Sequence, residues 1–378
     1  MADNTLTALA QTLFAGIQDV RRQANGFIPA VTSDISDKAA TINDPIRVTI
    51  NTAAANVSVV AGPTSPDGDA STPTSADVKL TKYKANRWKI KDEDVPVIER
   101  VGFQAWMSNK AQLSMLALLD EIDADIAALF TKATYGIGTP GTTPFASDFK
   151  QMAQLKRLAV EAGAPGTDLQ LVLVPLAAAN LRSNQQLNKL NESNPNGELL
   201  RQGILGDING FKIRESKNVV TSTPGTGSGY VTNGASAKGA VSVPVITGTN
   251  PFVQGDWLTF AADTNNAYIA NVYAGGAGNV SIRGGLKQII PTGNALTRGA
   301  AYVANMAFHR RALALAIRPP REIPGGDSAS ETMYVKDDLT GLTFQVARYG
   351  QYTQATYETR VLWGVECIEP ELLWLLAG

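Results

Sequence analysis

The longest regular hydrophobic pattern in the chain runs from Pro96 to Ala133. Apolar residues recur there at spacings of three and four, which places them on one face of an α-helix: Met115, Leu116, Leu119, Ile122, Ile126, Leu129 and Phe130. The other faces carry the acidic residues Asp120, Glu121, Asp123 and Asp125. The pattern therefore predicts one amphipathic helix, roughly 50 Å long at about 1.5 Å per residue, that needs a long partner surface within the chain or on another copy.

Alternation of apolar and polar residues predicts β-strands before this helix. It occurs from Ile46 to Val60, and again around Val78 to Leu80 and Trp88 to Ile90. The stretch GPTSPDGDASTPTSAD between the two arms contains no large apolar residue and is typical of a loop. We therefore expect an extended β-hairpin over residues 46–95. Residues 1–45 precede it as a short amphipathic helix and a polar, extended arm.

The segment after the long helix combines helical and strand patterns. A helical pattern covers 148–162, a continuous apolar run covers 169–174, a further helix opens at Pro175, and residues 211–213 alternate as a strand. A buried strand between two helices is typical of an α/β unit. We expect this unit to extend over residues 148–220.

Composition changes sharply at residues 221–301, where Gly, Ser, Thr, Asn and Val dominate and short alternating segments replace helical periodicity. This pattern predicts a small antiparallel β-domain inserted into the α/β unit. A helix-like pattern returns in NMAFHRRALALAI, residues 305–317. Two alternating segments follow at 342–347 and 356–365, and these strands are expected to pair with others near the long helix.

Composition and charge restrict the class of protein. The chain has 378 residues, of which 44% are hydrophobic and 18% charged, and its formal net charge is −1. A balance this close to neutral gives no general basis for gripping nucleic acid or an anionic membrane. The single cysteine excludes an intrachain disulfide, and neither a signal peptide nor an apolar run long enough for a membrane span is recognised. We expect a protein that is not exported.

The return arm of the predicted hairpin is basic: Lys79, Lys82, Lys84, Arg87, Lys89 and Lys91. Binding of nucleic acid, with Tyr83 and Trp88 stacking on bases, is one interpretation, and a strand edge kept soluble by charge is a second. A third interpretation fits better, in which this arm faces an acidic helix face on another copy. The candidate intersubunit contacts are then Lys82, Lys84, Arg87, Asp120, Glu121 and Asp123.

Residues that could carry catalysis are sparse. His309 is the only histidine, and neither a nucleophilic serine motif nor carboxylates at metal-binding spacing accompany it. Cys367 lies among apolar residues and is interpreted as a packing residue. The neighbouring Glu366, Glu369 and Glu371 have no spacing that fixes an acid/base pair. We therefore expect no catalytic residue, no cofactor and no metal ion, and a chain that is not an enzyme.

Three passages resemble the major capsid (coat) proteins of tailed bacteriophages, which share the Hong Kong 97 fold, and among them the podovirus group with an inserted telokin-like domain. They are GILGDINGFKIRESKNV at 203–219, NMAFHRRALALAIRPPREIPGG at 305–326 and DDLTGLTFQVARYGQYTQATYETRVLWGVECIEPEL at 337–372. The order of the parts along the chain is similar as well. In the middle passage, Ala307, Phe308 and His309 precede an expected alanine-rich helix.

The resemblance implies an α+β capsid fold with an N-terminal arm, an extended β-hairpin loop, a spine helix and an axial α/β domain that carries an inserted antiparallel β-domain. The implied divisions are the N-terminal helix and arm, the extended loop, the spine helix with a peripheral region, the first axial part, the inserted domain, and the second axial part with closing peripheral strands: 1–45, 46–95, 96–147, 148–220, 221–301 and 302–378.

The resemblance also implies a function. Copies of a coat protein are made in the host cytoplasm and assemble into pentamers and hexamers of an icosahedral virion shell, with a scaffolding protein and a portal as partners. Such a shell encloses double-stranded DNA without sequence-specific binding and contacts no membrane. Two alternatives remain open: a nanocompartment shell protein that encloses enzymes, and a carbohydrate-binding or enzymatic protein built around the glycine-rich β-region.

Overall fold

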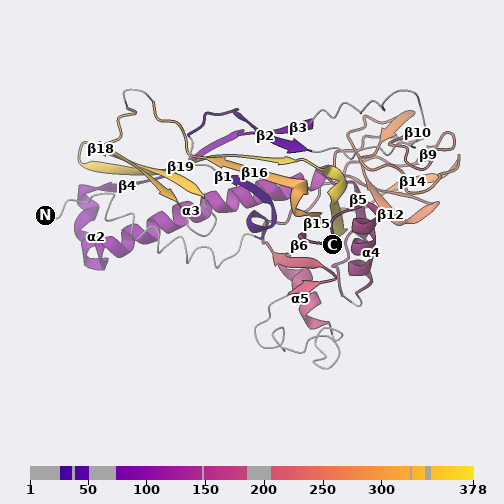
Figure 1. The fold of residues 1–378 in the computed structure, drawn as a ribbon, viewed down its shortest axis with the longest axis horizontal. Helices are drawn as coiled ribbons and strands as arrows, with labels where there is room; N and C mark the ends of the chain where they lie inside the picture. Colours follow the sequence, from indigo (N-terminus) through magenta and orange to yellow (C-terminus); the bar gives the residue numbers. More distant parts are fainter. Residues whose placement is uncertain are drawn as a thin grey trace, which may run out of the picture.

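The computed structural model describes residues 26–35, 39–50, 74–146, 149–184, 206–323, 326–336 and 342–378. The expected N-terminal helix and residues 62–73 of the expected hairpin tip lie outside these residues. The loop prediction is wrong at residues 74–77, which belong to strand β3 (Thr74–Lys79). The described strands form a 6-stranded sheet, a 12-stranded sheet and a separate 2-stranded sheet. Figure 1 shows the long helix α3 extending along the first of these sheets, with several strands of the second gathered at the end opposite α2.

The expected long helix is present but divided. Helix α2 spans Val95–Val101, α3 spans Phe103–Ala127, and the 3₁₀ helix η4 continues over Ala128–Lys132. The prediction of one uninterrupted helix is wrong at Gly102, whose φ of 99° lies outside the helical region. A residue without a side chain tolerates such a backbone, so Gly102 ends one helix and precedes the next.

Helix α3 packs against two separate groups of buried side chains. Its first half contributes Met107, Ala111 and Met115 to a cluster with Ile90 and Tyr357. Its second half joins the main core through Leu118, Leu119, Ile122, Ile126 and Ala127. The apolar face expected from the sequence is therefore buried, except that Leu116 and Leu129 are only half-buried. The long partner surface that such a helix needs lies within the same chain.

The six-stranded sheet joins strands from both ends of the chain. Its order is β1 (Thr32–Ile35), β16 (Leu313–Arg318), β19 (Gln354–Cys367), β18 (Thr343–Gln351) and β17 (Glu331–Lys336), and β4 (Lys82–Lys91) also pairs with β19. The β4–β19 register runs antiparallel from Lys91↔Gln354 to Lys82↔Trp363. The expectation that late strands return to pair near the long helix is confirmed.

This pairing corrects the expected hairpin. Strand β2 (Pro45–Ile50) pairs with β3 (Thr74–Lys79), but the basic arm that follows belongs to β4 and leaves the hairpin. The cause is the apolar face of β4. Trp88 stacks on Tyr357 of β19 with ring centroids 4.4 Å apart, and Ile90 is buried beneath α3.

Residues 305–317 are strands, so the predicted helix there is wrong. Strand β15 (Ala304–His309) and β16 flank the short 3₁₀ helix η5 (Arg310–Ala312). In β16 the larger side chains Leu313, Leu315 and Ile317 lie in the main core. Ala314 and Ala316 face the opposite side, against Val78 and Leu80. A strand buried on both faces lacks the apolar–polar alternation that distinguishes it from a helix.

The twelve-stranded sheet contains the expected α/β unit. Strands β20 (Leu373–Ala377), β15, β6 (Leu169–Leu173), β8 (Phe211–Glu215) and β7 (Asp207–Ile208) are neighbours in that order. Helices α4 (Lys150–Glu161) and α5 (Pro175–Ser183) precede and follow β6, and Figure 1 shows both on the same side of the molecule. The helices and the buried strand expected here are confirmed.

The glycine-rich region continues the same sheet. Its strands are β9 (Tyr230–Thr232), β10 (Ser242–Ile246), β11 (Trp257–Phe260), β12 (Asp263–Ile269), β13 (Gly278–Ser281) and β14 (Ala295–Arg298). They pair antiparallel with one another, and β12 joins β5 (Tyr135–Gly138) in the rest of the sheet. They also enclose a cluster of their own that includes Tyr230, Phe252 and Tyr268. The boundaries of an inserted domain, like the other divisions of the chain, stay a prediction.

Candidate functional site

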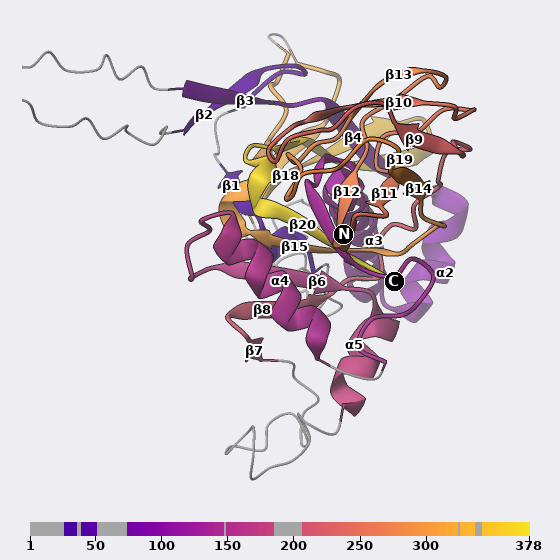
Figure 2. The same cartoon turned by 90° about the vertical axis from the view of Figure 1, so that its right-hand side faces the viewer.

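The β2–β3 hairpin pairs with no third strand among the described residues. Figure 2 shows both strands pointing away from the body of the molecule. The hairpin has an apolar face formed by Ile46, Val48, Ala76 and Val78, since the register pairs Ile46 with Val78 and Val48 with Ala76. Only Val78, next to the body, is fully buried, and the other three are half-buried. The apolar face is thus covered at its base and less completely beyond it.

The base of the hairpin is fixed tightly to the body. Leu80 is 0% exposed, its carbonyl accepts the Asn43 amide at 2.8 Å, and its own amide donates to Asp44 at 3.2 Å. Strand β19 passes directly beneath, where a Cβ atom on Gly364 would lie 1.9 Å from the Lys79 carbonyl oxygen. Only glycine allows this close approach, so the hairpin projects from a rigid point.

Lys82 and Lys84 of β4 form ion pairs with α3 of the same chain. The Lys82 Nζ atom lies 2.6 Å from an Asp125 carboxylate oxygen, and the Lys84 Nζ atom lies 3.2 Å from Glu121. The second Asp125 oxygen accepts the Trp363 indole N–H at 2.7 Å. The acidic partner of the basic arm is therefore present within one chain, and contact of these side chains with a second copy stays a prediction.

The other predicted contact residues lie apart from this ion-pair seam. Arg87 lies on the opposite face of β4 and binds Glu358 of β19 at 3.0 Å. Asp120 binds Lys217 at 2.8 Å near the end of β8. Asp123 is 0% exposed, so it is not available to a neighbouring copy and that assignment is wrong. Its place in the helical pattern gave no sign of burial, because the residues that cover it come from distant parts of the chain.

The face of β4 and β19 that carries Arg87 bears a charged network that sequence reasoning missed. Arg360 lies between Glu358 at 3.2 Å and Asp327 at 2.8 Å, and Tyr349 donates its hydroxyl to Asp327 at 2.8 Å. The Arg360 guanidinium holds the pKa of Asp327 below its ordinary value. Hydrogen bonding and attraction from Glu358 raise the pKa of Arg87. Alternation in β19 predicts that Glu358 and Arg360 lie on one face of the sheet. Which residues lie beside them depends on the strands that pair with β19, and the sequence pattern does not give that pairing.

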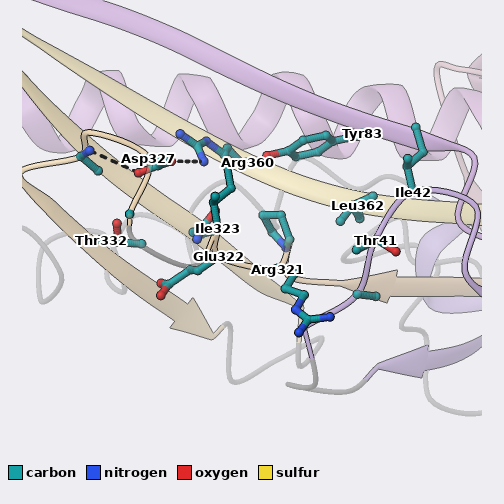
Figure 3. A pocket seen from close by; sticks show the side chains of 15 residues that line it. Thr41, Ile42, Tyr83, Arg321, Glu322, Ile323, Asp327, Thr332, Arg360 and Leu362 are labelled. Atoms are coloured by element: carbon teal, nitrogen blue, oxygen red, sulfur yellow. Dashed lines mark hydrogen bonds and ion pairs between the residues drawn. The ribbon is translucent and has the colours of Figure 1, made fainter.

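A cavity of about 340 Å³ opens beside this network, and Figure 3 shows the ion pair of Arg360 and Asp327 at its wall. Its other side is lined by Ile42, Tyr83 and Ile323, which are 52%, 46% and 63% exposed. In its wall Arg360 pairs with Asp327 at 2.8 Å and Glu322 accepts the Tyr334 hydroxyl at 3.0 Å, while Ile42, Tyr83 and Ile323 supply exposed apolar surface. Such a wall offers packing surface rather than groups poised for a reaction.

The nucleic-acid interpretation of the basic arm loses its stacking partner. Trp88 is enclosed between Tyr357 and Trp106, with ring centroids 4.4 and 6.0 Å away. Tyr83 is exposed, but a single exposed ring gives no row of stacking platforms. Of the six basic residues, four already bind carboxylates in the chain: Lys82, Lys84, Arg87 and Lys91.

The candidate catalytic residues lie in packed surroundings. His309 is 5% exposed, its Nδ1 atom accepts the Arg311 amide at 3.3 Å, and burial lowers its pKa below the ordinary value. Burial raises the pKa of the Cys367 thiol to about 12, which keeps it protonated. Glu366 and Glu369 form ion pairs with Lys132 and Arg311. Among the described residues, no group of three or more His, Cys, Asp or Glu side chains is arranged to hold a metal ion.

None of the described helices is both long enough and apolar enough to cross a bilayer.

Comparison with known proteins gives similarities at the level of solved structures. No protein-family model matches the chain, and no curated protein matches it. The chain is similar to the capsid structure of the cyanophage P-SCSP1u (12% identity, TM-score 0.49, covering 94% of this chain and 88% of the other). It is also similar to the mature capsid of bacteriophage PhiM1 (12%, 0.48, covering 94% and 87%) and to a virus-like particle from Pyrococcus furiosus (9%, 0.41, covering 97% of each).

These solved structures are two phage capsids and a virus-like particle. Each TM-score lies below 0.5, so the function proposed below rests on the features of this chain.

Proposed function

We propose that this chain is the structural shell protein of a tailed bacteriophage, a major capsid protein whose copies form pentamers and hexamers of an icosahedral shell. One observation carries the proposal: the β2–β3 hairpin projects from a fixed base and has an apolar face that its own chain covers only in part. A two-stranded hairpin alone is marginally stable in water. A second copy of the chain that covers this face supplies the missing surface.

The rest of the chain suits a mechanical role. Helix α3 ties two buried clusters together along its length, and β4 and β19 hold that helix to the sheet. A wall built this way transmits force without a cleft that must open and close. The formal net charge of the chain, −1, also suits a container, because a strongly basic wall would hold packaged DNA too firmly for release.

On this proposal the divisions of the chain take the roles that the resemblance implies. Residues 46–95 reach neighbouring copies, residues 96–147 form the spine and its peripheral region, and residues 148–220 with 302–378 form the axial and closing parts. Residues 221–301 extend the shell surface as an inserted β-domain. A scaffolding protein and a portal are the expected partners, double-stranded DNA is the enclosed cargo, and synthesis occurs in the host cytoplasm.

Negative-stain electron microscopy of the purified chain, alone and co-expressed with a candidate scaffolding protein, tests this proposal. We expect closed particles of uniform diameter. Nucleic acid packaged in particles purified from infected cells would support a virion, whereas enclosed enzymes would instead identify a nanocompartment shell. Dispersed single chains in every preparation would contradict the proposal and direct attention to a ligand of the glycine-rich β-region.

A further inference from the structure

A buried carboxylate on α3 joins two segments that are far apart in the sequence. One Asp123 oxygen accepts the backbone N–H groups of Phe27 at 3.0 Å and Ile28 at 3.3 Å. The other accepts the Ser216 hydroxyl at 2.5 Å and the Asn218 side-chain amide at 3.2 Å. All four donors are uncharged, and within the part of the chain that the structure describes the Asp123 side chain forms no ion pair.

The first of these segments, residues 26–31, is packed within the body of the molecule. Phe27 is 0% exposed and lies in the main core, and its carbonyl accepts the Ala30 amide of the short 3₁₀ helix η2 (Ile28–Ala30). A Cβ atom on Gly26 would lie 2.4 Å from the carbonyl oxygen of Glu215. Residues 26–28 are thus packed between α3 on one side and the end of β8 on the other.

The second segment is the turn that follows β8. Ser216 both donates to Asp123 and accepts the Asn218 amide at 3.1 Å, so the two residues form one connected chain of hydrogen bonds. Asn218 also donates to the Asp120 carbonyl at 3.4 Å. At the surface, the Lys217–Asp120 ion pair closes the same turn. Glu215, at the end of β8, pairs with Arg182.

The free-energy cost of burying this carboxylate indicates that Asp123 does more than fill space in the core. Removing a carboxylate from water without a cation is costly, and four hydrogen bonds are needed to offset that cost. An apolar side chain at this position would leave the Phe27 and Ile28 amides and the Asn218 side chain without this acceptor. The site therefore maintains its contacts only while both segments stay in place together.

We propose that Asp123 is a latch that couples residues 26–31 to the turn at residues 216–218 through α3. A shift of the turn weakens the hydrogen bonds at Phe27 and Ile28. Ser216 and Asn218 donate to Asp123, and Phe27 and Ile28 donate to the other oxygen of the same carboxylate. This contact fixes the position of residues 26–31 against α3 and determines whether they move together with the helix. The proposal concerns one folded chain and does not depend on assembly.

Hydrogen exchange of the unassembled full chain, followed at the amides of residues 26–31, tests the latch. In Asp123→Asn we expect exchange at Phe27 and Ile28 to accelerate by about ten- to a hundredfold, because hydrogen bonds to a charged acceptor are lost. Ser216→Ala keeps the carboxylate and should accelerate exchange at the same two amides by a smaller factor. Glu121→Gln, which removes the ion pair with Lys84 on another face of α3, is the matched control on the same helix and should leave both amides unchanged.

The two-variant design keeps the test decisive. If Asp123→Asn does not fold, Ser216→Ala carries the test, because the Ser216 hydroxyl bonds to Asp123 and to neither Phe27 nor Ile28. Unchanged exchange at these amides in Ser216→Ala would overturn the coupling, and so would equal acceleration throughout the chain, which indicates general destabilisation. A chain that fails to form shells but shows the local acceleration supports the latch while contradicting the proposed function.

Discussion

Helix α3 carries two polar contacts that differ in almost every physical respect. On one face, Glu121 and Asp125 bind Lys82 and Lys84 of β4, and the two lysine side chains are 40% and 52% exposed. On another, Asp123 is fully enclosed, and its donors among the described residues are all uncharged. Exposed ion pairs contribute little to stability and are screened by salt, whereas a buried carboxylate that loses its partners is strongly destabilising. The comparison indicates that the buried contact serves the fold, whereas a role of the exposed seam between copies stays a prediction.

The largest expected effect comes from reversing the charge of the exposed residues. The triple variant Lys82→Glu, Lys84→Glu and Arg87→Glu places like charges beside Glu121, Asp125 and Glu358. Under the proposed function we expect shells to be lost while the single chain stays folded by circular dichroism. The matched triple glutamine variant removes the charges without repulsion and should retain more assembly. Normal shells from the glutamate variant would contradict a role for these charges between copies.

Removing the buried carboxylate should instead destabilise the single chain. We expect Asp123→Ala to lower the free energy of unfolding by about 3 kcal/mol, because its backbone and side-chain donors lose their acceptor. Chemical denaturation of the unassembled chain measures this change. Asp120→Ala, which removes only the surface pair with Lys217, should cost about 1 kcal/mol or less. Equal losses in the two variants would remove the distinction between the buried and exposed contacts.

The pH dependence of stability sharpens the same contrast. Burial raises the pKa of Asp123 in the folded chain, although the hydrogen bonds from Ser216, Asn218, Phe27 and Ile28 oppose that rise. The folded chain therefore binds this proton more tightly than the unfolded chain does. Its contribution to stability falls as the pH rises from the ordinary aspartate pKa, about 4, to the raised value, and is constant above it.

Asp123→Asn should remove this fall in stability. The difference in the free energy of unfolding between the parent chain and the variant, measured against pH, separates the contribution of Asp123 from those of other groups. Asp327 has a lowered pKa and acts in the opposite direction, with stability lost as the pH falls through its folded pKa. Its contribution is the same in both proteins and cancels. Parallel pH profiles for the parent chain and the variant would show that Asp123 does not titrate as expected.

The smallest effect is expected at Cys367. Burial raises the pKa of its thiol to about 12, so almost no thiolate is present at pH 8. We expect iodoacetamide to leave the folded chain unmodified at this pH and to alkylate it fully in denaturant, as measured by mass. Rapid alkylation of the folded chain would show that this part of the sheet opens more readily than the packing around Asp123.

Periodicity predicted the elements whose partners are local. The helices near 150–161 and 175–183 and the strand at 169–173 follow from spacing and from a continuous apolar run. The pattern failed at residues 305–317 because β15 and β16 are buried on both faces and so show no strand alternation. It also missed the break at Gly102, since one glycine within a helical pattern is often tolerated.

Helical spacing is equally limited in predicting which acidic residues of the long helix are contact residues. By helical spacing, Glu121 and Asp125 share one face, and Asp120 and Asp123 share another. Spacing separates these faces but does not say which of them is covered. The segments that enclose Asp123 begin at residue 26 and residue 216, and only the folded chain brings them together. Glu358, Arg360 and Asp327 were missed for the same reason.

The apolar face of the projecting hairpin offers the most direct test of the proposed function. Val48 and Ala76 are register partners on that face, both half-buried, and Val48→Asp with Ala76→Asp makes the face charged. Sedimentation velocity of the parent chain and of this double variant, under the conditions that give particles, measures whether the face joins copies. We predict fast-sedimenting closed shells from the parent chain and folded single chains from the variant. Identical shells from both proteins would contradict the claim that copies hold one another through this hairpin.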